Sequence, residues 1–165
     1  MASDARRRVA VVGATGVAGQ QFLVSLAGHP QFEVAALAAS SRSAGKRYTD
    51  AITDPSGRVG WHCEEALPEA FGRMPVFDAE RLDLRGLDLV FSAVESDAAR
   101  KLEELYAPQV PVVSTSSAFR YEDDVPIIVP GVNHEHVQLV KRQQRERGWK
   151  GFVLPIPNCT ATGLV

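Results

Sequence analysis

The most informative segment of the chain is Val9-Ala10-Val11-Val12-Gly13-Ala14-Thr15-Gly16-Val17-Ala18-Gly19. Its four leading apolar residues are typical of a strand that is covered on both faces in a parallel sheet. Three glycines in the spacing G-x-x-G-x-x-G then lead into the helical periodicity of residues 17–27. Gly13 permits a tight turn, Gly16 lets backbone approach a pyrophosphate, and Gly19 lets the helix pack closely against the strand. The segment therefore predicts a strand, a turn and a helix whose first N–H groups can bind an anion.

The specificity of this glycine pattern depends on its surroundings. A lone pattern is weak evidence for a dinucleotide site, but here a strand signal precedes it and a helix signal follows it. A glycine-rich turn without a ligand is the alternative. The candidate dinucleotide-binding residues in the turn are Gly13, Thr15, Gly16, Val17 and Ala18.

The segment after a second expected strand, residues 33–39, bears on which dinucleotide binds. An NAD site places an Asp or Glu near here to accept a hydrogen bond from the ribose 2′-hydroxyl. No acidic residue occurs between Glu33 and Asp50. Arginine can hold a phosphate through two parallel hydrogen bonds, so the basic and hydroxyl residues found there favour NADP(H) over NAD. Taken alone, the segment is also consistent with a solvated polar loop. The candidate contacts to the dinucleotide are Ser40, Ser41, Arg42 and Ser43, with Lys46 close by.

Strand and helix patterns alternate along the rest of the chain. Strands are expected at residues 87–91, 110–114, 127–129 and 151–154, and helices at residues 97–106, capped by Ser96, and 134–147, ended by Gly148. This alternation predicts an α/β fold, a Rossmann-type doubly wound, mostly parallel sheet with helices on both faces.

Two further segments are of interest in this fold. Ser92 and Ala93 follow the strand at residues 87–91, where a doubly wound sheet places its ligands, so they are candidate cofactor contacts. An ordinary capped turn is the alternative. Residues 40–75 are rich in Gly, Pro and Ser and are expected to form a long, partly structured excursion with a functional role.

Composition argues against several classes of function. The 165 residues are 45% hydrophobic and 23% charged, an ordinary globular balance. Eighteen basic residues and 20 acidic ones give a net charge of −2, which provides no electrostatic reason to expect nucleic-acid or membrane binding. No apolar run reaches the roughly 20 residues of a membrane helix, and none resembles a signal peptide.

The positions of the cysteines bear on the cellular compartment and on metal binding. Cys63 and Cys159 lack the spacing of a disulfide framework, so a reducing cytoplasm is expected. His62 and Cys63 are direct neighbours that cannot comfortably chelate one ion together, so no metal site is expected.

Cys159 is a candidate nucleophile, and it lies within the segment Pro155-Ile156-Pro157-Asn158-Cys159-Thr160. A strand-like run precedes it and small, helix-compatible residues follow it, so the sulfur is expected where a helix begins. Unpaired N–H groups at that position stabilise an anion, and a thiol there loses its proton more readily and becomes a nucleophile. From this segment alone, a small buried hydrophobic cysteine is supported about equally well.

Together these segments resemble the aspartate-semialdehyde dehydrogenase family, most closely its archaeal and fungal-like branch. The resemblance extends over nearly the whole chain and implies that NADPH reduces L-aspartyl 4-phosphate to aspartate 4-semialdehyde and phosphate, or the reverse, in lysine, threonine and methionine biosynthesis. The blocks that carry it are residues 13–20, 41–46, 116–120, 124–126, 129–130, 132–133 and 157–160.

The resemblance also implies roles for individual residues. Cys159 is implied to attack the acyl carbon and form a thioester, and Asn158 to hold the local geometry beside it. Arg120 is implied to bind the substrate phosphate; a surface arginine is the alternative. A thiolate is a strong nucleophile and a workable leaving group, so one difficult displacement becomes two easier steps.

The resemblance implies that two parts of the chain belong to domains with different functions. Residues 1–150 are expected to form an NADP-binding domain, and residues 151–165 to begin a catalytic and dimerisation domain. The family's general base, a histidine, and its carboxylate-binding arginine lie in a second half, so the chain is expected to be an N-terminal part without turnover of its own. The full-length protein is expected to be a homodimer or homotetramer acting on a small acyl phosphate.

Three departures from the family pattern leave the acyl-phosphate substrate open. Thr115 stands where asparagine is common, Gly131 where glutamate is common, and Glu95 where proline is frequent. Two other functions remain as alternatives. One is an N-acetyl-γ-glutamyl-phosphate reductase-like enzyme, whose cysteine typically follows glycine and precedes an aromatic residue; the other is a non-catalytic NADP-sensing module with an inert Cys159.

Overall fold

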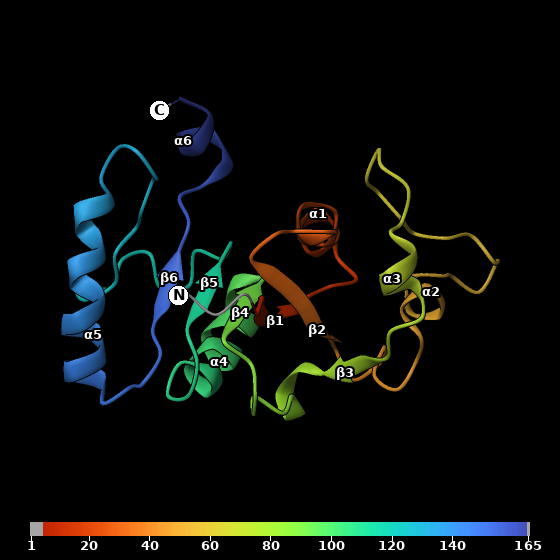
Figure 1. The fold of residues 1–165 in the computed structure, drawn as a ribbon, viewed down its shortest axis with the longest axis horizontal. Helices are drawn as coiled ribbons and strands as arrows, with labels where there is room; N and C mark the ends of the chain where they lie inside the picture. Colours follow the sequence, from red (N-terminus) through yellow and green to blue (C-terminus); the bar gives the residue numbers. More distant parts are fainter. Residues whose placement is uncertain (1–4, 165) are drawn as a thin grey trace. The chain divides into compact units, whose positions relative to one another are not determined.

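The computed structural model describes residues 5–164, which form an α/β fold built on one parallel sheet (Figure 1). The sheet has six strands in the order β3-β2-β1-β4-β5-β6, which is the doubly wound order of dinucleotide-binding folds. The predicted fold class is confirmed. Backbone contacts divide the chain into two compact units, the first ending at Phe91 and the second beginning at Ser92.

The first unit is built around two long parallel strands and the helix between them. Its elements are β1 (Arg7–Val12), α1 (Val17–Leu26), β2 (Phe32–Ala39), α2 (Tyr48–Ala51), α3 (Glu69–Gly72), β3 (Val76–Asp78), the 3₁₀ turn η1 (Ala79–Arg81) and most of β4 (Leu89–Ser92). β1 runs parallel to β2, from Arg7 opposite Phe32 to Val12 opposite Ala38. The last four residues of β1 are buried, as expected for a strand covered on both faces.

The excursion between β2 and β3 is partly helical and contributes to the core of the first unit. Tyr48, Ile52 and Phe71 are each less than 10% exposed and belong to the same hydrophobic cluster as Val9, Val11 and Leu37 of the sheet. The excursion is therefore packed against the sheet, and the expectation that it is partly structured is confirmed. Its functional role stays a prediction.

The second unit contains the remaining elements. These are α4 (Ser96–Tyr106), β5 (Val112–Ser114), the 3₁₀ helix η2 (His134–Gln138), α5 (Leu139–Arg147), β6 (Val153–Pro155) and α6 (Cys159–Leu164). β5 and β6 are parallel, with Val112 opposite Val153. Gly148 ends α5 in the left-handed conformation at φ +67°, as the sequence predicted.

The expected strand at residues 127–129 is wrong. The side-chain amide of Asn133 accepts from the Val129 N–H at 2.7 Å and donates to the Ile127 carbonyl at 3.0 Å. These are backbone groups that a strand would offer to its neighbour, so one side chain replaces the sheet ladder here. Pro126 and Pro130 flank the segment and supply no N–H.

The expected capping role of Ser96 is also wrong. α4 begins at Ser96 itself, and no side chain caps its N-terminus. The Ser96 hydroxyl instead lies 2.7 Å from the hydroxyl of Ser117. A helix that starts one residue earlier than expected places this serine in the first turn, where it pairs with the loop after β5.

Candidate dinucleotide and thiol sites

The glycine turn joins β1 to α1 with the geometry that the sequence predicted. Gly13 has φ +79°, a left-handed conformation that glycine adopts without strain. A Cβ on Gly19 would lie 2.2 Å from the Gly13 carbonyl oxygen, so only glycine allows this close approach of α1 to the turn. A Cβ on Gly16 would make only an ordinary contact at 3.5 Å. The turn is therefore closed on the side of Gly19 and open at Gly16.

The open side of the turn fits an anionic ligand. Gly16, Val17 and Ala18 are exposed at the start of α1. No side chain caps this helix, and its first turn contains no acidic residue. Uncapped N–H groups and the positive end of the helix dipole together suit a phosphate group. Thr15 is half-buried at the base of the turn.

The polar loop that follows β2 lies next to the turn at the carboxyl ends of the strands. The N–H groups of Gly13 and Ala14 both donate to the carbonyl of Ala38, at 2.9 and 3.1 Å. Ala38 is followed closely by the loop residues Ser40, Ser41 and Arg42, all exposed, and Ser43, half-buried. The structure thus brings the two predicted cofactor segments of the first unit together.

The polar loop is held by its own backbone. Ser43 N–H donates to the Ser40 carbonyl at 2.9 Å, and Gly45 N–H donates to the Val76 carbonyl at 2.8 Å. Val76 N–H returns a hydrogen bond to the Lys46 carbonyl at 2.9 Å. The exposed guanidinium of Arg42 is therefore carried on a loop that is anchored to β3.

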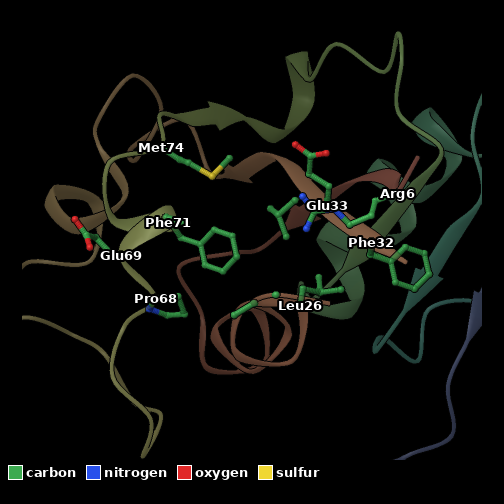
Figure 2. Close-up of a pocket in the computed structure, with 12 residues that line it drawn as sticks. Arg6, Leu26, Phe32, Glu33, Pro68, Glu69, Phe71 and Met74 are labelled. Carbon is green, nitrogen blue, oxygen red and sulfur yellow. The ribbon is translucent and has the colours of Figure 1, made fainter. Parts of the chain in front are cut away.

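A separate cavity of about 440 Å³ lies elsewhere in the first unit (Figure 2). Leu26, Phe32, Phe71 and Met74 contribute apolar walls, and Arg6 and Glu33 contribute charge. None of the predicted site residues lines it. Because it lies where α1 ends and β2 begins, it is at the opposite end of these elements from the glycine turn.

Cys159 is the first residue of α6, and its side chain is exposed. The position predicted for the sulfur at a helix start is confirmed, and a buried hydrophobic cysteine is not observed. Asn158 precedes it and caps the helix: its Oδ1 accepts from the Ala161 N–H at 2.7 Å. The Asn158 carbonyl accepts from the N–H and the hydroxyl of Thr162, both at 3.0 Å.

Arg120 is anchored to backbone on two sides. Its Nη2 donates to the Thr115 carbonyl at 2.8 Å, and its Nε donates to the Ile156 carbonyl at 3.1 Å. Ile156 N–H in turn donates to the Ser114 carbonyl at 2.8 Å. Arg120 therefore joins the end of β5 to the segment that leads into Cys159, instead of lying free on the surface.

Ser92 is buried, and its hydroxyl faces the interior. It donates to Oε1 of Glu103 on α4 at 2.8 Å, and Ser114 donates to the same oxygen at 2.5 Å. The Ser92 carbonyl accepts from the Thr115 N–H at 3.0 Å. The hydroxyl of Ser92, a residue predicted as a cofactor contact, is thus already used inside the unit, whereas Ala93 is half-buried beside it.

The sequence patterns did not identify Glu103, although it joins the ends of β4 and β5. Its side chain is 1% exposed, and its Oε2 has no hydrogen-bond partner among residues 5–164. Burial raises the pKa of this carboxyl group, and the two serine hydroxyls act in the opposite direction. A glutamate on an amphipathic helix gives no sequence signal that distinguishes it from a solvated one.

A charged network holds the loop that carries Arg120. The Phe119 ring is buried beneath two guanidinium groups. The Cζ atom of Arg100 lies 4.2 Å from the ring centroid, and that of Arg147 lies 5.7 Å from it. Arg147 donates to Asp124 at 2.6 Å and also pairs with Glu122. Hydrogen bonding from Arg147 lowers the pKa of Asp124.

One of the three departures from the family pattern has a local explanation. Gly131 has φ +87°, a conformation in which a glutamate side chain would be strained. Thr115 bonds to Ser92 and Arg120 through its backbone N–H and carbonyl, so these contacts do not explain the choice of threonine. Nothing in the structure explains the choice of glutamate at position 95.

Residues 5–164 contain neither a metal-binding cluster nor a membrane-spanning helix. In this range, no three His, Cys, Asp or Glu side chains are grouped so that they could hold a metal ion. Nor does any helix in the same range have the length and apolar character needed to cross a membrane.

The strand order and the uncapped glycine turn define the chain as a dinucleotide-binding domain of the Rossmann type. The sequence model of the family described as "Semialdehyde dehydrogenase, NAD binding domain" matches residues 8–140. The chain belongs to this family.

Similar proteins of known name agree with this membership. The chain is 42% identical over 156 residues to an aspartate-semialdehyde dehydrogenase of Methanothermobacter thermautotrophicus, covering 94% of the chain and 43% of that protein. It is 40% identical to the Saccharomyces cerevisiae protein of the same name, covering 94% and 42% respectively. The crystal structure of aspartate semialdehyde dehydrogenase with NADP from Candida albicans superposes with a TM-score of 0.83 at 39% identity, over 98% of this chain and 45% of that one. The chain thus spans less than half the length of these relatives.

Proposed function

We propose that this chain supplies the NADP(H)-binding part of an aspartate-semialdehyde dehydrogenase. The observation that carries the proposal is the open, uncapped glycine turn beside a polar loop that contains Arg42 and no acidic residue. The Candida albicans enzyme was crystallised with NADP, which supports the choice of cofactor, and the names of the relatives support the choice of reaction over the N-acetyl-γ-glutamyl-phosphate alternative.

The residues of the first unit would hold the two phosphate regions of the cofactor. The exposed backbone of Gly16, Val17 and Ala18 suits the pyrophosphate, with Gly13 and Thr15 shaping the turn. Arg42 suits the 2′-phosphate because a guanidinium can donate two parallel hydrogen bonds. The hydroxyls of Ser40, Ser41 and Ser43 add neutral donors on the same loop.

The residues of the second unit would carry out the covalent chemistry. Cys159 sulfur attacks the acyl carbon of L-aspartyl 4-phosphate, a C–S bond forms, and phosphate leaves with the electrons of the broken C–O bond. Asn158 keeps the sulfur at the start of α6 by capping that helix. Bound NADPH would supply a hydride to the thioester carbon, and the C–S bond would then break, so that the aldehyde leaves and the Cys159 thiolate is restored.

Arg120 would assist the departure of the phosphate. The anchored Nε–Nη2 edge of its guanidinium fixes the direction of the side chain. The remaining hydrogens on Nη1 and Nη2 can fork onto phosphate oxygens. A fixed cation costs little reorganisation when negative charge accumulates on the leaving group.

The wider setting of the enzyme is part of the same proposal. The full-length protein is a cytoplasmic homodimer or homotetramer in lysine, threonine and methionine biosynthesis. Residues 1–150 form its NADP-binding domain, and residues 151–165 begin its catalytic and dimerisation domain. Backbone around Ser92 and Ala93 lines the cofactor region, since the Ser92 hydroxyl is bound to Glu103.

A titration of the chain with NADPH and NADH tests the proposal. Arg42→Ala should weaken NADPH at least tenfold more than NADH, because only NADPH carries the 2′-phosphate and a lost charge-assisted contact is worth about 1.5–3 kcal/mol. Arg58→Ala, at another exposed arginine of the same unit, is the matched control and should change neither affinity. Equal losses for NADPH and NADH would contradict the assigned contact.

A further inference from the structure

Two fully buried polar side chains hold carbonyls of the glycine turn. The hydroxyl of Tyr48, in α2, donates to the Ala14 carbonyl at 2.7 Å. Nε2 of Gln20, in α1, donates to the Thr15 carbonyl at 3.2 Å. Both side chains are 0% exposed. Consecutive carbonyls of the turn are therefore fixed from the protein interior.

Gln20 also ties the turn to the excursion between β2 and β3. Its Nε2 donates to the Gly60 carbonyl at 2.7 Å, and its Oε1 accepts from the His62 N–H at 2.7 Å. Both amide hydrogens donate to backbone carbonyls, and the amide oxygen accepts from a backbone N–H. One side chain thus links the turn with residues 40 or more positions further along the chain.

The excursion is itself rigidly attached to the core. Tyr48 N–H donates to the Met74 carbonyl at 2.9 Å, and Gly60 N–H donates to the Ile52 carbonyl at 2.7 Å. Tyr48 and Ile52 belong to the buried cluster of the first unit. The groups that hold the turn are therefore held in place by packing as well as by hydrogen bonds.

These contacts set the direction of N–H groups in the turn. In a trans peptide the carbonyl and the N–H of the next residue point in opposite directions. Anchoring the Ala14 carbonyl toward buried Tyr48 turns the Thr15 N–H to the opposite side. Burial raises the pKa of Tyr48, with a smaller contribution from Cys63, so its hydroxyl keeps the proton that it donates.

We propose that Tyr48 and Gln20 are positioning residues that preorganise the glycine turn for the pyrophosphate of a dinucleotide. This inference rests on the proposed function, because it assumes that the turn binds NADP(H). It also assigns a role to the excursion, which supports the turn through Tyr48 and through the bonds of Gln20 to Gly60 and His62. The buried side chains of Tyr48 and Gln20 do not themselves contact the ligand. A turn held in its binding geometry loses less conformational entropy when the ligand arrives.

The test measures the affinity of Tyr48→Phe for three ligands. NADPH and NADH share the pyrophosphate, whereas adenosine 2′-phosphate lacks it and binds only through the adenosine end. Loss of one buried hydrogen bond should weaken NADPH and NADH by the same factor, roughly 3- to 10-fold, and leave adenosine 2′-phosphate unchanged. Tyr106→Phe removes a buried tyrosine hydroxyl from the second unit and should change none of the three affinities.

A second variant keeps the inference testable if Tyr48→Phe unfolds. Gln20→Glu retains the acceptor for the His62 N–H but replaces the donor to the Thr15 and Gly60 carbonyls with an oxygen, and it should give the same ligand pattern. Gln143→Glu is its control, since Gln143 is an equally buried glutamine with three backbone hydrogen bonds in the second unit.

The outcomes separate this inference from the proposed function. If wild-type chain binds NADPH but the variants bind all three ligands normally, the inference is wrong and the proposed function stands. A variant that weakens adenosine 2′-phosphate as much as NADPH also overturns the inference, because the pyrophosphate is then not involved. If the wild-type chain binds neither dinucleotide, both fail.

Discussion

The Arg120 guanidinium donates to the main-chain carbonyl of Ile156 over 3.1 Å. Ile156 lies three residues before Cys159, so the loop after β5 and the segment that enters α6 are joined by one side chain. The same guanidinium also holds the Thr115 carbonyl. Arg120, which the family resemblance implies to bind phosphate, therefore also has a structural role within the second unit.

Arg120→Lys should reveal this structural role without removing the charge. An ammonium group cannot donate in two fixed coplanar directions as the guanidinium does. We expect the free energy of unfolding of the chain to fall by roughly 1–2 kcal/mol, the scale of a lost hydrogen bond to a charged group, measured by urea denaturation. Arg145→Lys, at an exposed arginine of α5, is the control. Unchanged stability in Arg120→Lys would show that the two backbone contacts contribute nothing.

The glycines at positions 16 and 19 should behave differently when each is replaced by alanine. Gly19→Ala forces a Cβ against backbone of the turn and should destabilise the chain by about 1–3 kcal/mol, as overpacking does. Gly16→Ala meets no such obstacle and should leave the thermal midpoint nearly unchanged, yet weaken NADPH about tenfold or more because its methyl group occupies the open side of the turn. A stable Gly19→Ala variant would contradict the close packing of α1.

Glu103→Gln should become relatively more stable than wild type as the pH rises from 4 to 7. Burial raises the pKa of Glu103, so the stability that its neutral form contributes is fully present below its unfolded-state pKa and is lost as pH rises through its folded-state pKa. Glutamine cannot ionise and avoids that loss. The measurement is the difference in unfolding free energy between the two proteins at each pH. A difference independent of pH would mean that the carboxyl group is not penalised by burial.

Asp124→Asn should show the opposite dependence. Hydrogen bonds from Arg147 lower the pKa of Asp124, so its contribution to stability is present above its unfolded-state pKa and is lost as pH falls through its folded-state pKa. We expect the substitution to lower the free energy of unfolding by about 2 kcal/mol at pH 7 and by less in acid. Asp83→Asn, whose partner Arg85 is exposed, should have no measurable effect at either pH. A loss in Asp124→Asn that persists at low pH would argue against an ionic origin.

Local patterns in the sequence predicted those features that depend on neighbouring residues. The run from Val9 to Gly19 contains its own strand, turn and helix start, and the spacing indicates the conformational role of Gly13 and the steric role of Gly19. The start of α6 at Cys159 follows in the same way from the proline-rich entry and the small residues after it. The alternation of such segments was sufficient to predict the doubly wound sheet.

Features that depend on partners distant in sequence could not be predicted. Glu103 meets Ser92 and Ser114 only because α4 packs against the ends of β4 and β5, and each pair is 11 residues apart. Tyr48 reaches Ala14 across 34 residues. The expected strand at residues 127–129 fails for a related reason: its apolar pattern is genuine, but the Asn133 side chain competes for its backbone groups.

Trapping the enzyme-bound acyl group tests directly whether Cys159 is the nucleophile of the proposed NADP-dependent reaction. The full-length protein is mixed with aspartate semialdehyde and NADP without phosphate, quenched in acid, and its peptides are analysed by mass spectrometry. Cys63 is an internal control, because it is half-buried and the pKa of its thiol is raised. Burial is the larger cause of this shift, and the negative charge of Glu65 is the smaller one. The proposed function predicts one aspartyl thioester on Cys159 for each NADPH formed, and none on Cys63. NADPH formation without an acyl group on Cys159, or equal acylation of both cysteines, would contradict it.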